Sequence, residues 1–134
     1  MSLIATCHCG ATRIELPHPP ASAGECNCTF CARTGAVWGY FKPGELKILS
    51  ETAGRVYTAN PDGMNEHHFC FTCGMHTYGI SPDWASMYNS DGTPKDGDPT
   101  AMPTSQIFAV NLRLIDDFDW SSVEIEKMDG RNNW

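Results

Sequence analysis

The stretch "HHFCFTCGMHTYGI", residues 67–80, combines strand-forming residues with two cysteines three positions apart. Cys70 and Cys73 have the C-x-x-C spacing that wraps a tight turn around a tetrahedral ion, and Gly74 eases the backbone around it. Two more groups of cysteines precede this stretch, "CHCG" at residues 7–10 and "CNCTFC" at residues 26–31. All seven cysteines of the chain thus fall into a pair, a triple and another pair.

The odd number of cysteines predicts two different metal sites. Two closed tetrahedral zinc sites need eight sulfurs, whereas seven can form one closed site and one site with an open fourth position. The triple is compact enough to form the open site alone, and the two outer pairs would then clamp the N-terminal strand to a central hairpin. The structural ligands predicted in this way are Cys7, Cys9, Cys70 and Cys73, and those of the second zinc are Cys26, Cys28 and Cys31.

Strand geometry gives one reason for these assignments. On a strand, both cysteines of C-x-C point to the same face and the residue between them points to the other. We therefore expect Cys7 and Cys9 to face one metal while His8 turns away, and Cys26 and Cys28 to do the same around Asn27.

Other roles for the cysteines stay open at this point. The start of the chain, "MSLIATCHCG", has no basic leader, which predicts a cytoplasmic protein, and in the cytosol stable disulfides are rare. A redox relay through the metal-free triple is a further alternative. His67, His68 or His76 could also complete the open site, although a lone histidine near a strand is more often a surface or hydrogen-bonded residue.

Length and charge limit the partners. We expect 134 residues to form one domain, 1–134. The net charge of −7, the pI near 5.0 and the scattered Lys and Arg residues argue against nucleic acid. No apolar run approaches the ~20 residues needed to cross a bilayer. The expected partners are small molecules or another protein, with the oligomeric state left open.

Alternating and aromatic-rich runs predict an all-β fold of several short antiparallel strands. In "ATRIELP", Ile14 and Leu16 share one face and Arg13 and Glu15 the other. No convincing helix is predicted, "NPDG" at 60–63 is a turn signal, and residues 84–105 form a long loop that is either a surface excursion or an active-site cover. The strand-like runs lie in residues 11–17, 36–41, 46–50, 54–59, 67–80, 105–115 and 122–128.

An open three-thiolate zinc site suits a thiol substrate. Three thiolates give the site a net negative charge, so its water is a poor acid, whereas an incoming sulfur can take the open position as thiolate. Arg33, two residues after the triple, could moderate this charge or pair with a substrate carboxylate; an ordinary surface role is equally compatible.

The motifs "CHCG", "CNCTFCARTGA" and "HHFCFTCGMHTY", in this order, resemble the glutathione-dependent formaldehyde-activating family, which includes centromere-protein-V-like proteins. The resemblance continues through "VNLRLIDD" at 110–117 and ends with "DGRNNW" at 129–134. It implies an Mss4-like fold of small β-sheets, two zinc ions on the cysteine sets given above, and a carbon–sulfur lyase that joins glutathione to formaldehyde.

The resemblance also places candidate residues for the substrate. Asn111 and Arg113 lie in a family-like stretch and are candidates to line the pocket, although a structural role fits them equally. Two other classes of function remain: a non-catalytic zinc-stapled binding module, which the acidic balance disfavours for chromatin or microtubules, and a thiol or metal redox sensor.

Overall fold

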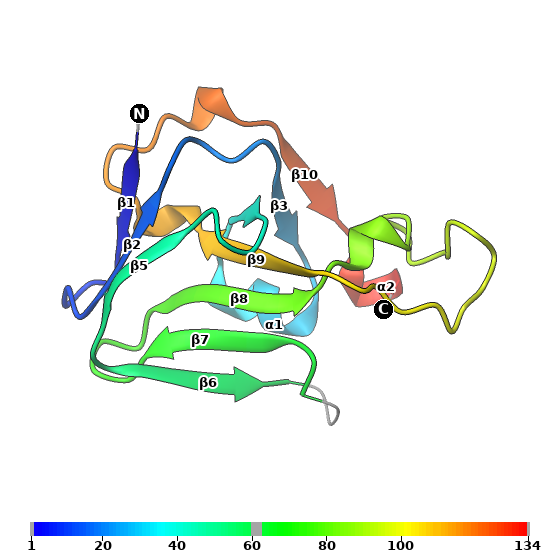
Figure 1. The fold of residues 1–134 in the computed structure, drawn as a ribbon, viewed down its shortest axis with the longest axis horizontal. Helices are drawn as coiled ribbons and strands as arrows, with labels where there is room; N and C mark the ends of the chain where they lie inside the picture. Colours follow the sequence, from blue (N-terminus) through cyan, green and yellow to red (C-terminus); the bar gives the residue numbers. More distant parts are fainter. Residues whose placement is uncertain (1, 60–62, 134) are drawn as a thin grey trace.

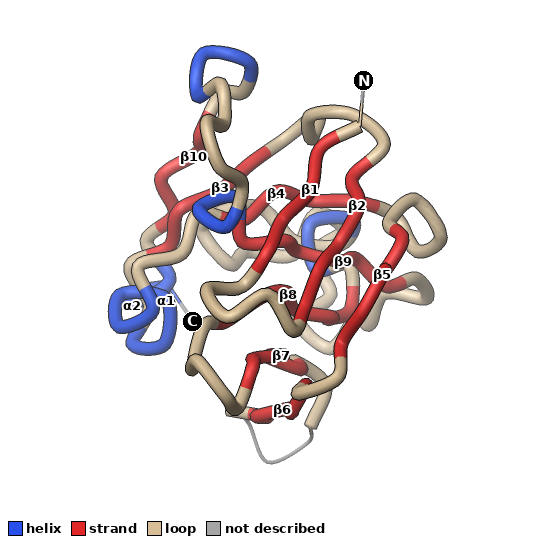
Figure 2. The backbone as a smooth tube through the Cα atoms, turned by 90° about the vertical axis from the view of Figure 1, so that its left-hand side faces the viewer, coloured by secondary structure: helices blue, strands red, loops and turns tan. Residues whose placement is uncertain are grey.

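The computed structural model describes residues 2–59 and 63–133 and confirms a mainly β fold built from two sheets (Figures 1 and 2). The smaller sheet has the order β1-β2-β5 and the larger one β10-β3-β4-β9-β8-β7-β6. The small sheet consists of β1 (Leu3–Thr6), β2 (Thr12–Leu16) and β5 (Lys47–Glu51). The large sheet consists of β3 (Ala23–Cys26), β4 (Trp38–Phe41), β6 (Gly54–Thr58), β7 (Glu66–Cys70), β8 (His76–Pro82), β9 (Gln106–Asn111) and β10 (Ile125–Met128).

The predicted strands are present, and the predicted alternation in β2 is confirmed. Ile14 and Leu16 are buried, whereas Arg13 is exposed and Glu15 half-buried. Pairing among the described strands is antiparallel except between β3 and β10, which run parallel. The predicted turn at residues 60–63 falls, apart from Gly63, outside the described part of the chain.

The expectation that helices are absent is wrong. A six-residue helix, α1 (Thr29–Thr34), begins inside the cysteine triple, and a short helix, α2 (Gly130–Asn133), lies at the C-terminal end. The described residues also contain three single turns of 3₁₀-helix: η1 (Trp84–Ser86), η2 (Leu112–Leu114) and η3 (Trp120–Ser122). No helix in residues 2–59 and 63–133 is long and apolar enough to cross a membrane.

The core lies where the two sheets face each other. Its small-sheet members include Ile14 and Leu16, and its large-sheet members include Phe41 and Val110, each at most 2% exposed. Leu112, from the 3₁₀ turn after β9, is fully buried in the same cluster. Because strands leave side chains on alternate faces, one face of each sheet builds this core.

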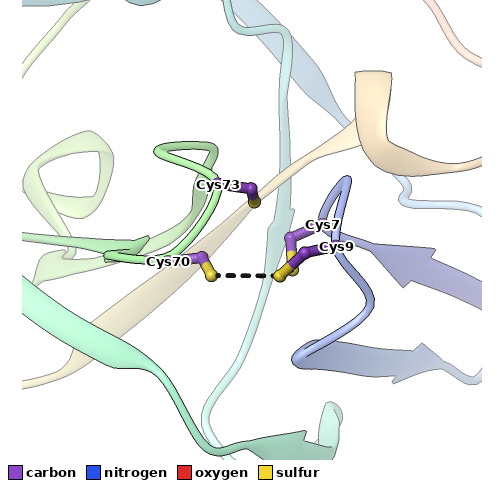
Figure 3. A group of neighbouring side chains, drawn as sticks. All are labelled: Cys7, Cys9, Cys70 and Cys73. Carbon is purple, nitrogen blue, oxygen red and sulfur yellow. Dashed lines mark hydrogen bonds between the residues drawn. The ribbon is translucent and has the colours of Figure 1, made fainter.

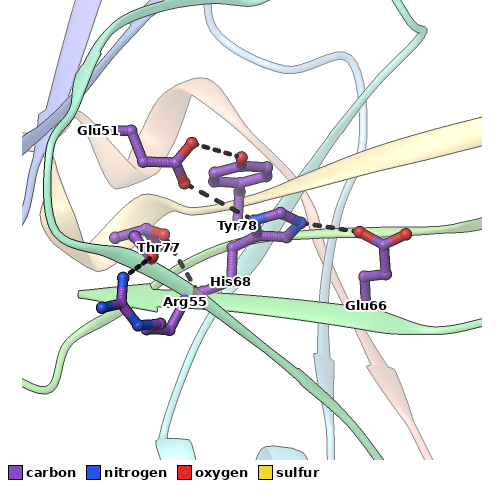
Figure 4. A network of polar contacts seen from close by, with 7 residues as sticks. Glu51, Arg55, Glu66, His68, Thr77 and Tyr78 are labelled. Carbon is purple, nitrogen blue, oxygen red and sulfur yellow. Dashed lines mark hydrogen bonds and ion pairs between the residues drawn. The ribbon is translucent and has the colours of Figure 1, made fainter. Parts of the chain in front are cut away.

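A polar network also joins the two sheets (Figure 4). Glu51, at the end of β5, accepts a hydrogen bond of 3.1 Å from the Tyr78 hydroxyl of β8 and lies 3.6 Å from His68 Nδ1 of β7. The other ring nitrogen of His68 lies 3.0 Å from Glu66 Oε1. Burial and the Glu51 carboxylate both raise the pKa of Tyr78. Its hydroxyl therefore keeps its proton and donates a hydrogen bond to Glu51.

Residues 84–105 form an ordered excursion rather than a cover. The segment projects from the body of the protein (Figure 1) and is held by its own contacts, with the Tyr88 hydroxyl 2.8 Å from the Ala101 carbonyl oxygen and Lys95 Nζ 2.8 Å from the Ala85 carbonyl oxygen. None of its residues lines either of the two hollows beside α1 described below. Of the two sequence interpretations, the surface excursion agrees with this position.

Replacing Tyr78 by Phe tests the network between the sheets. Tyr78 is 3% exposed, so Tyr78→Phe keeps the packed ring but leaves Glu51 without its hydroxyl donor. We expect the free energy of unfolding to fall by about 1–3 kcal/mol, the range for a buried bond to a charged group, measured by urea denaturation. An unchanged unfolding midpoint would show that the Glu51–Tyr78 bond contributes nothing to holding the sheets together.

Candidate metal centres

Two turns, one from each sheet, bring four cysteines together (Figure 3). Cys7 and Cys9 lie in the turn between β1 and β2, and Cys70 and Cys73 lie at the turn between β7 and β8. The two turns are built alike, because a glycine N–H after the second cysteine bonds the carbonyl of the first: Gly10 to Cys7 at 3.0 Å and Gly74 to Cys70 at 2.7 Å. Both glycines have positive φ, of 85° and 79°, which L side chains rarely adopt.

The spacing of these four sulfurs fits one metal ion. Sulfurs bound at about 2.3 Å in a tetrahedron lie about 3.8 Å apart. The Cys7 and Cys9 sulfurs are 3.8 Å apart, those of Cys9 and Cys70 are 3.6 Å apart, and all four lie within 4.8 Å of one another. Cys7 and Cys70 are buried, so a metal here would be largely shielded by protein, as structural zinc sites are.

The strand-based reason for this convergence is wrong, although the four residues do meet. Neither C-x-C motif lies in a strand: Cys7 and Cys9 follow β1, and Cys26 ends β3 while Cys28 caps α1. The cysteines face a common point because tight turns direct their sulfurs inward. The Cys7 sulfur, for example, accepts the Thr12 N–H at 3.2 Å across its turn.

The triple is arranged around the start of α1. The sulfurs of Cys26, Cys28 and Cys31 lie within 4.8 Å of one another, and no other potential ligand of the described chain belongs to the group. Cys28 is the N-cap, whose sulfur accepts the Cys31 N–H, and Gly35 ends the helix in the left-handed conformation at φ 68°. The sequence "CTFCARTG" therefore contains both ends of α1, but six residues are too few to show helical periodicity.

Each sulfur of the triple accepts one N–H group. The donors are the Cys28 N–H for Cys26 at 3.4 Å, the Cys31 N–H for Cys28 at 3.3 Å, and Trp38 Nε1 for Cys31 at 3.4 Å. Donors of this kind stabilise a thiolate without occupying a coordination position. Trp38, which sequence reasoning missed, reaches the site because β4 runs beside β3.

The thiols of the metal-free triple differ in acidity. Burial, joined by the neighbouring thiol of Cys28, raises the pKa of Cys31 to about 12 despite the Trp38 N–H. Burial also works to raise the pKa of Cys28, but the N–H of Cys31 and the adjacent thiols outweigh it and leave the pKa below its ordinary value. Three sulfurs at this distance cannot all ionise alone, so a bound cation is the simplest way to hold them as thiolates.

A hollow of about 240 Å³ opens beside two of these sulfurs. Cys26 and Cys31 line it together with Arg113, whose Nε donates to the Gly35 carbonyl at 2.7 Å and whose guanidinium lies 5.8 Å from the centre of the Trp120 ring. Arg113 therefore presents a fixed positive charge next to the triple. Its position depends on η2, which the sequence pattern of a continuous strand over 105–115 did not predict.

A wider groove of about 710 Å³ lies along another side of α1. Two of the three substrate residues predicted from the sequence, Arg33 and Asn111, line it, but they differ in how many hydrogen bonds their side chains already make. Arg33 is exposed and uses one guanidinium nitrogen to bond the Thr29 carbonyl. Asn111 is buried and already bonds the His76 carbonyl and the Arg113 N–H, which is a structural role. The remaining lining is largely apolar: Phe30, Thr34, Val56, Tyr57, Phe69, Gly74, Met75 and His76.

The histidines do not join the triple. His67 stacks on Phe30 with ring centres 3.7 Å apart, His76 meets the same ring edge-on at 5.2 Å, and His68 belongs to the Glu51 network. Burial lowers the pKa of His67 to about 4, with the neighbouring histidines adding to the effect, so its imidazole is neutral at pH 7. Of these rings, those of Phe30 and His76 line the groove of about 710 Å³.

Comparison with known proteins identifies the family of the chain. The family model described as "Glutathione-dependent formaldehyde-activating enzyme" matches residues 2–111. The chain belongs to this family. A Halomonas elongata protein named "Putative glutathione-dependent formaldehyde-activating enzyme" is 28% identical over 138 residues, covering 96% of this chain and 85% of that protein.

A solved structure supports the fold. The crystal structure of a Rhodobacter sphaeroides protein has a TM-score of 0.62 and 24% sequence identity, covering 96% of this chain and 100% of its own. At this identity the match concerns the architecture only.

A matched pair of substitutions tests whether the two cysteine clusters differ in role. Cys73→Ser removes one sulfur from the cluster that joins both sheets. In zinc-finger peptides, a structural zinc contributes on the order of 10 kcal/mol to folding. We expect Cys73→Ser to unfold the protein or lower its melting temperature severely, and Cys28→Ser to leave a folded protein. Circular dichroism melts and metal content measure the two effects. Equal loss of structure in both variants would contradict the distinction.

Proposed function

We propose that the protein is a zinc-dependent carbon–sulfur lyase that joins a thiol such as glutathione to formaldehyde or a related small aldehyde. In this proposal Cys7, Cys9, Cys70 and Cys73 hold a structural zinc, and Cys26, Cys28 and Cys31 hold a second zinc with an open position. The observation that carries it is the set of three sulfurs within 4.8 Å, without a fourth ligand from the described residues and beside a hollow that Arg113 also lines.

The donor set fits zinc. Thiolate sulfur is a preferred zinc ligand, and three protein ligands plus an open position are the usual composition of a working zinc site. When bound, the ion would supply a position that holds a substrate sulfur as thiolate. The N–H groups of Cys28, Cys31 and Trp38 keep the three protein thiolates in place and reduce their negative charge toward the incoming sulfur.

The reaction forms one carbon–sulfur bond. The thiol loses its proton, its sulfur attacks the carbonyl carbon of the aldehyde, and the carbonyl π pair moves to the oxygen, which takes up a proton to give the hydroxyl of the adduct. Arg113, which lines the hollow, would donate a hydrogen bond to this developing oxyanion. Holding both reactants in a small hollow would supply much of the acceleration.

The thiol's remaining atoms would extend from the hollow around α1. Residues of the same helix line both spaces: Ala32 faces the hollow, whereas Phe30 and Arg33 face the groove. The groove has room for a substrate of the size of a tripeptide, and Arg33 offers guanidinium donors for a carboxylate.

The first test is the metal count. Elemental mass spectrometry of protein purified without chelators should give close to two zinc ions per chain. One zinc per chain, with the triple empty, would remove the proposed catalytic centre and overturn the proposal.

The second test is the rate of adduct formation. Because aldehydes and thiols combine spontaneously, ¹³C exchange NMR with labelled formaldehyde and glutathione should measure the acceleration above background. We expect Cys28→Ser to abolish the acceleration and Arg113→Gln to reduce it on the order of 100-fold, the usual loss for an oxyanion donor, with Arg113→Lys retaining more. Full activity of Arg113→Gln, in a protein of unchanged melting temperature, would restrict Arg113 to a structural role.

A further inference from the structure

The C-terminal segment, residues 128–131, bonds the residue that lies between the first two cysteines of the triple. Strand β10 runs parallel to β3 and places Met128 opposite Cys26. The ladder continues by one residue, because the Asn27 N–H donates to the Met128 carbonyl at 3.1 Å. Asn27 is the residue between the two proposed ligands Cys26 and Cys28.

Every hydrogen-bonding group of Asn27 has a partner in this segment. Its Nδ2 donates to Asp129 Oδ1 at 2.8 Å, and its Oδ1 accepts the Arg131 N–H at 3.0 Å. Its backbone carbonyl accepts from Arg131 Nε, also at 3.0 Å. Together with the bond to Met128, four bonds join one residue to a segment whose Asp129 lies 102 positions away in sequence.

The partners of Asn27 are themselves fixed. Both carboxylate oxygens of Asp129 accept from Asn132 Nδ2 at 2.9 Å, and the Asn133 N–H bonds the Asp129 carbonyl at 3.1 Å. Gly130, between Asp129 and Arg131, is buried. The segment is thus an ordered surface against which the triple lies.

These bonds contribute to position more than to stability. Asn27 is exposed, so water could satisfy its polar groups, and the net free energy of each such bond is about 1 kcal/mol or less. The backbone torsions of Asn27, however, decide how the sulfurs on either side of it are directed. Fixing those torsions before a metal binds removes an ordering cost from binding.

We propose that residues 128–131 position the cysteine triple through Asn27, which makes Asn27 a positioning residue of the second metal site. The inference rests on the proposed function, since it requires that the triple hold a metal. Outer-shell partners of this kind change metal affinity by about 10- to 100-fold when they are lost.

The bonds between Asn27 and residues 128–131 are called the clamp below. A pair of substitutions that exchanges the amide of Asn27 with the carboxylate of Asp129 tests it. Asn27→Asp directs a carboxylate at Asp129 and should weaken the second zinc about 10- to 100-fold while the first zinc and the melting temperature stay unchanged. Asp129→Asn should also weaken it. In the double variant the amide and the carboxylate exchange places, so an amide donor again faces a carboxylate acceptor at the net charge of the wild type, and the affinity should return. Chelator competition on the full-length protein measures each zinc separately.

Cobalt substitution gives a readout that a purely structural role would not move. The sulfur-to-cobalt charge-transfer and d–d bands of the triple should shift in Asn27→Asp and return in the double variant. Asn133→Ala, at an exposed position of the same short helix α2, is the matched control and should leave the bands unchanged. If Asn27→Asp fails to fold, Arg131→Ala removes the Nε bond alone and should still weaken the second zinc.

The outcomes separate the two proposals. A wild-type protein with one zinc would defeat the proposed function before any variant is examined. A wild-type protein with two zinc ions, whose second zinc is held equally well by Asn27→Asp, would overturn the clamp and leave the proposed function standing. Weaker zinc binding in both single variants, with recovery in the double variant, supports the clamp. An effect of net charge alone would act in opposite directions in Asn27→Asp and Asp129→Asn, and damage to the fold would not be reversed in the double variant.

Discussion

The meeting of four thiols from two different sheets is the constraint on which the rest of the structure depends. Cys9 and Cys70 are 61 positions apart in sequence, yet their sulfurs are 3.6 Å apart. Sulfurs this close repel one another once they ionise, whereas a shared cation would bind the β1–β2 turn to the β7–β8 turn. Such a link would fix the small sheet on the large one at the edge of the core, and the Glu51 network also joins the two sheets.

The position of the second cluster follows from this arrangement. Once β7 and β8 are fixed, β9 and β4 are fixed by their ladders, and β4 brings Trp38 to the Cys31 sulfur. The triple needs no help to come together, because closing a loop of a few residues costs about 2 kcal/mol less than closing one of about sixty. Its sulfurs must, however, be oriented toward one point. The N-cap bond of α1, Trp38 and the C-terminal segment provide this orientation.

Strands and turns that depend on neighbouring residues could be predicted from the sequence. Alternation identified β2, and the spacing of Cys70 and Cys73 followed by Gly74 predicted the turn found there. The turn at Gly10 was missed, because Cys7 and Cys9 were expected on a strand. Helix α1 was missed because its six residues lie among the cysteines, where spacing was interpreted as turn geometry. The parallel pairing of β10 and the contacts of Asn27 are long-range and partly exposed. Hydrophobic periodicity along the sequence therefore could not predict them. Arg113 was noted only through resemblance, since its place depends on a 3₁₀ turn.

The two clusters share one ligand chemistry but differ in how the chain supplies it. The outer four come from two sheets, so metal binding there would be inseparable from folding. The triple comes from one stretch of six residues, so a metal bound there could leave or change ligands without unfolding the protein. A working site needs this second property, because a substrate must enter and depart at the open position. The geometry of such a local site is not fixed by the packing of the two sheets. Neighbouring N–H donors and the C-terminal segment therefore have to hold it.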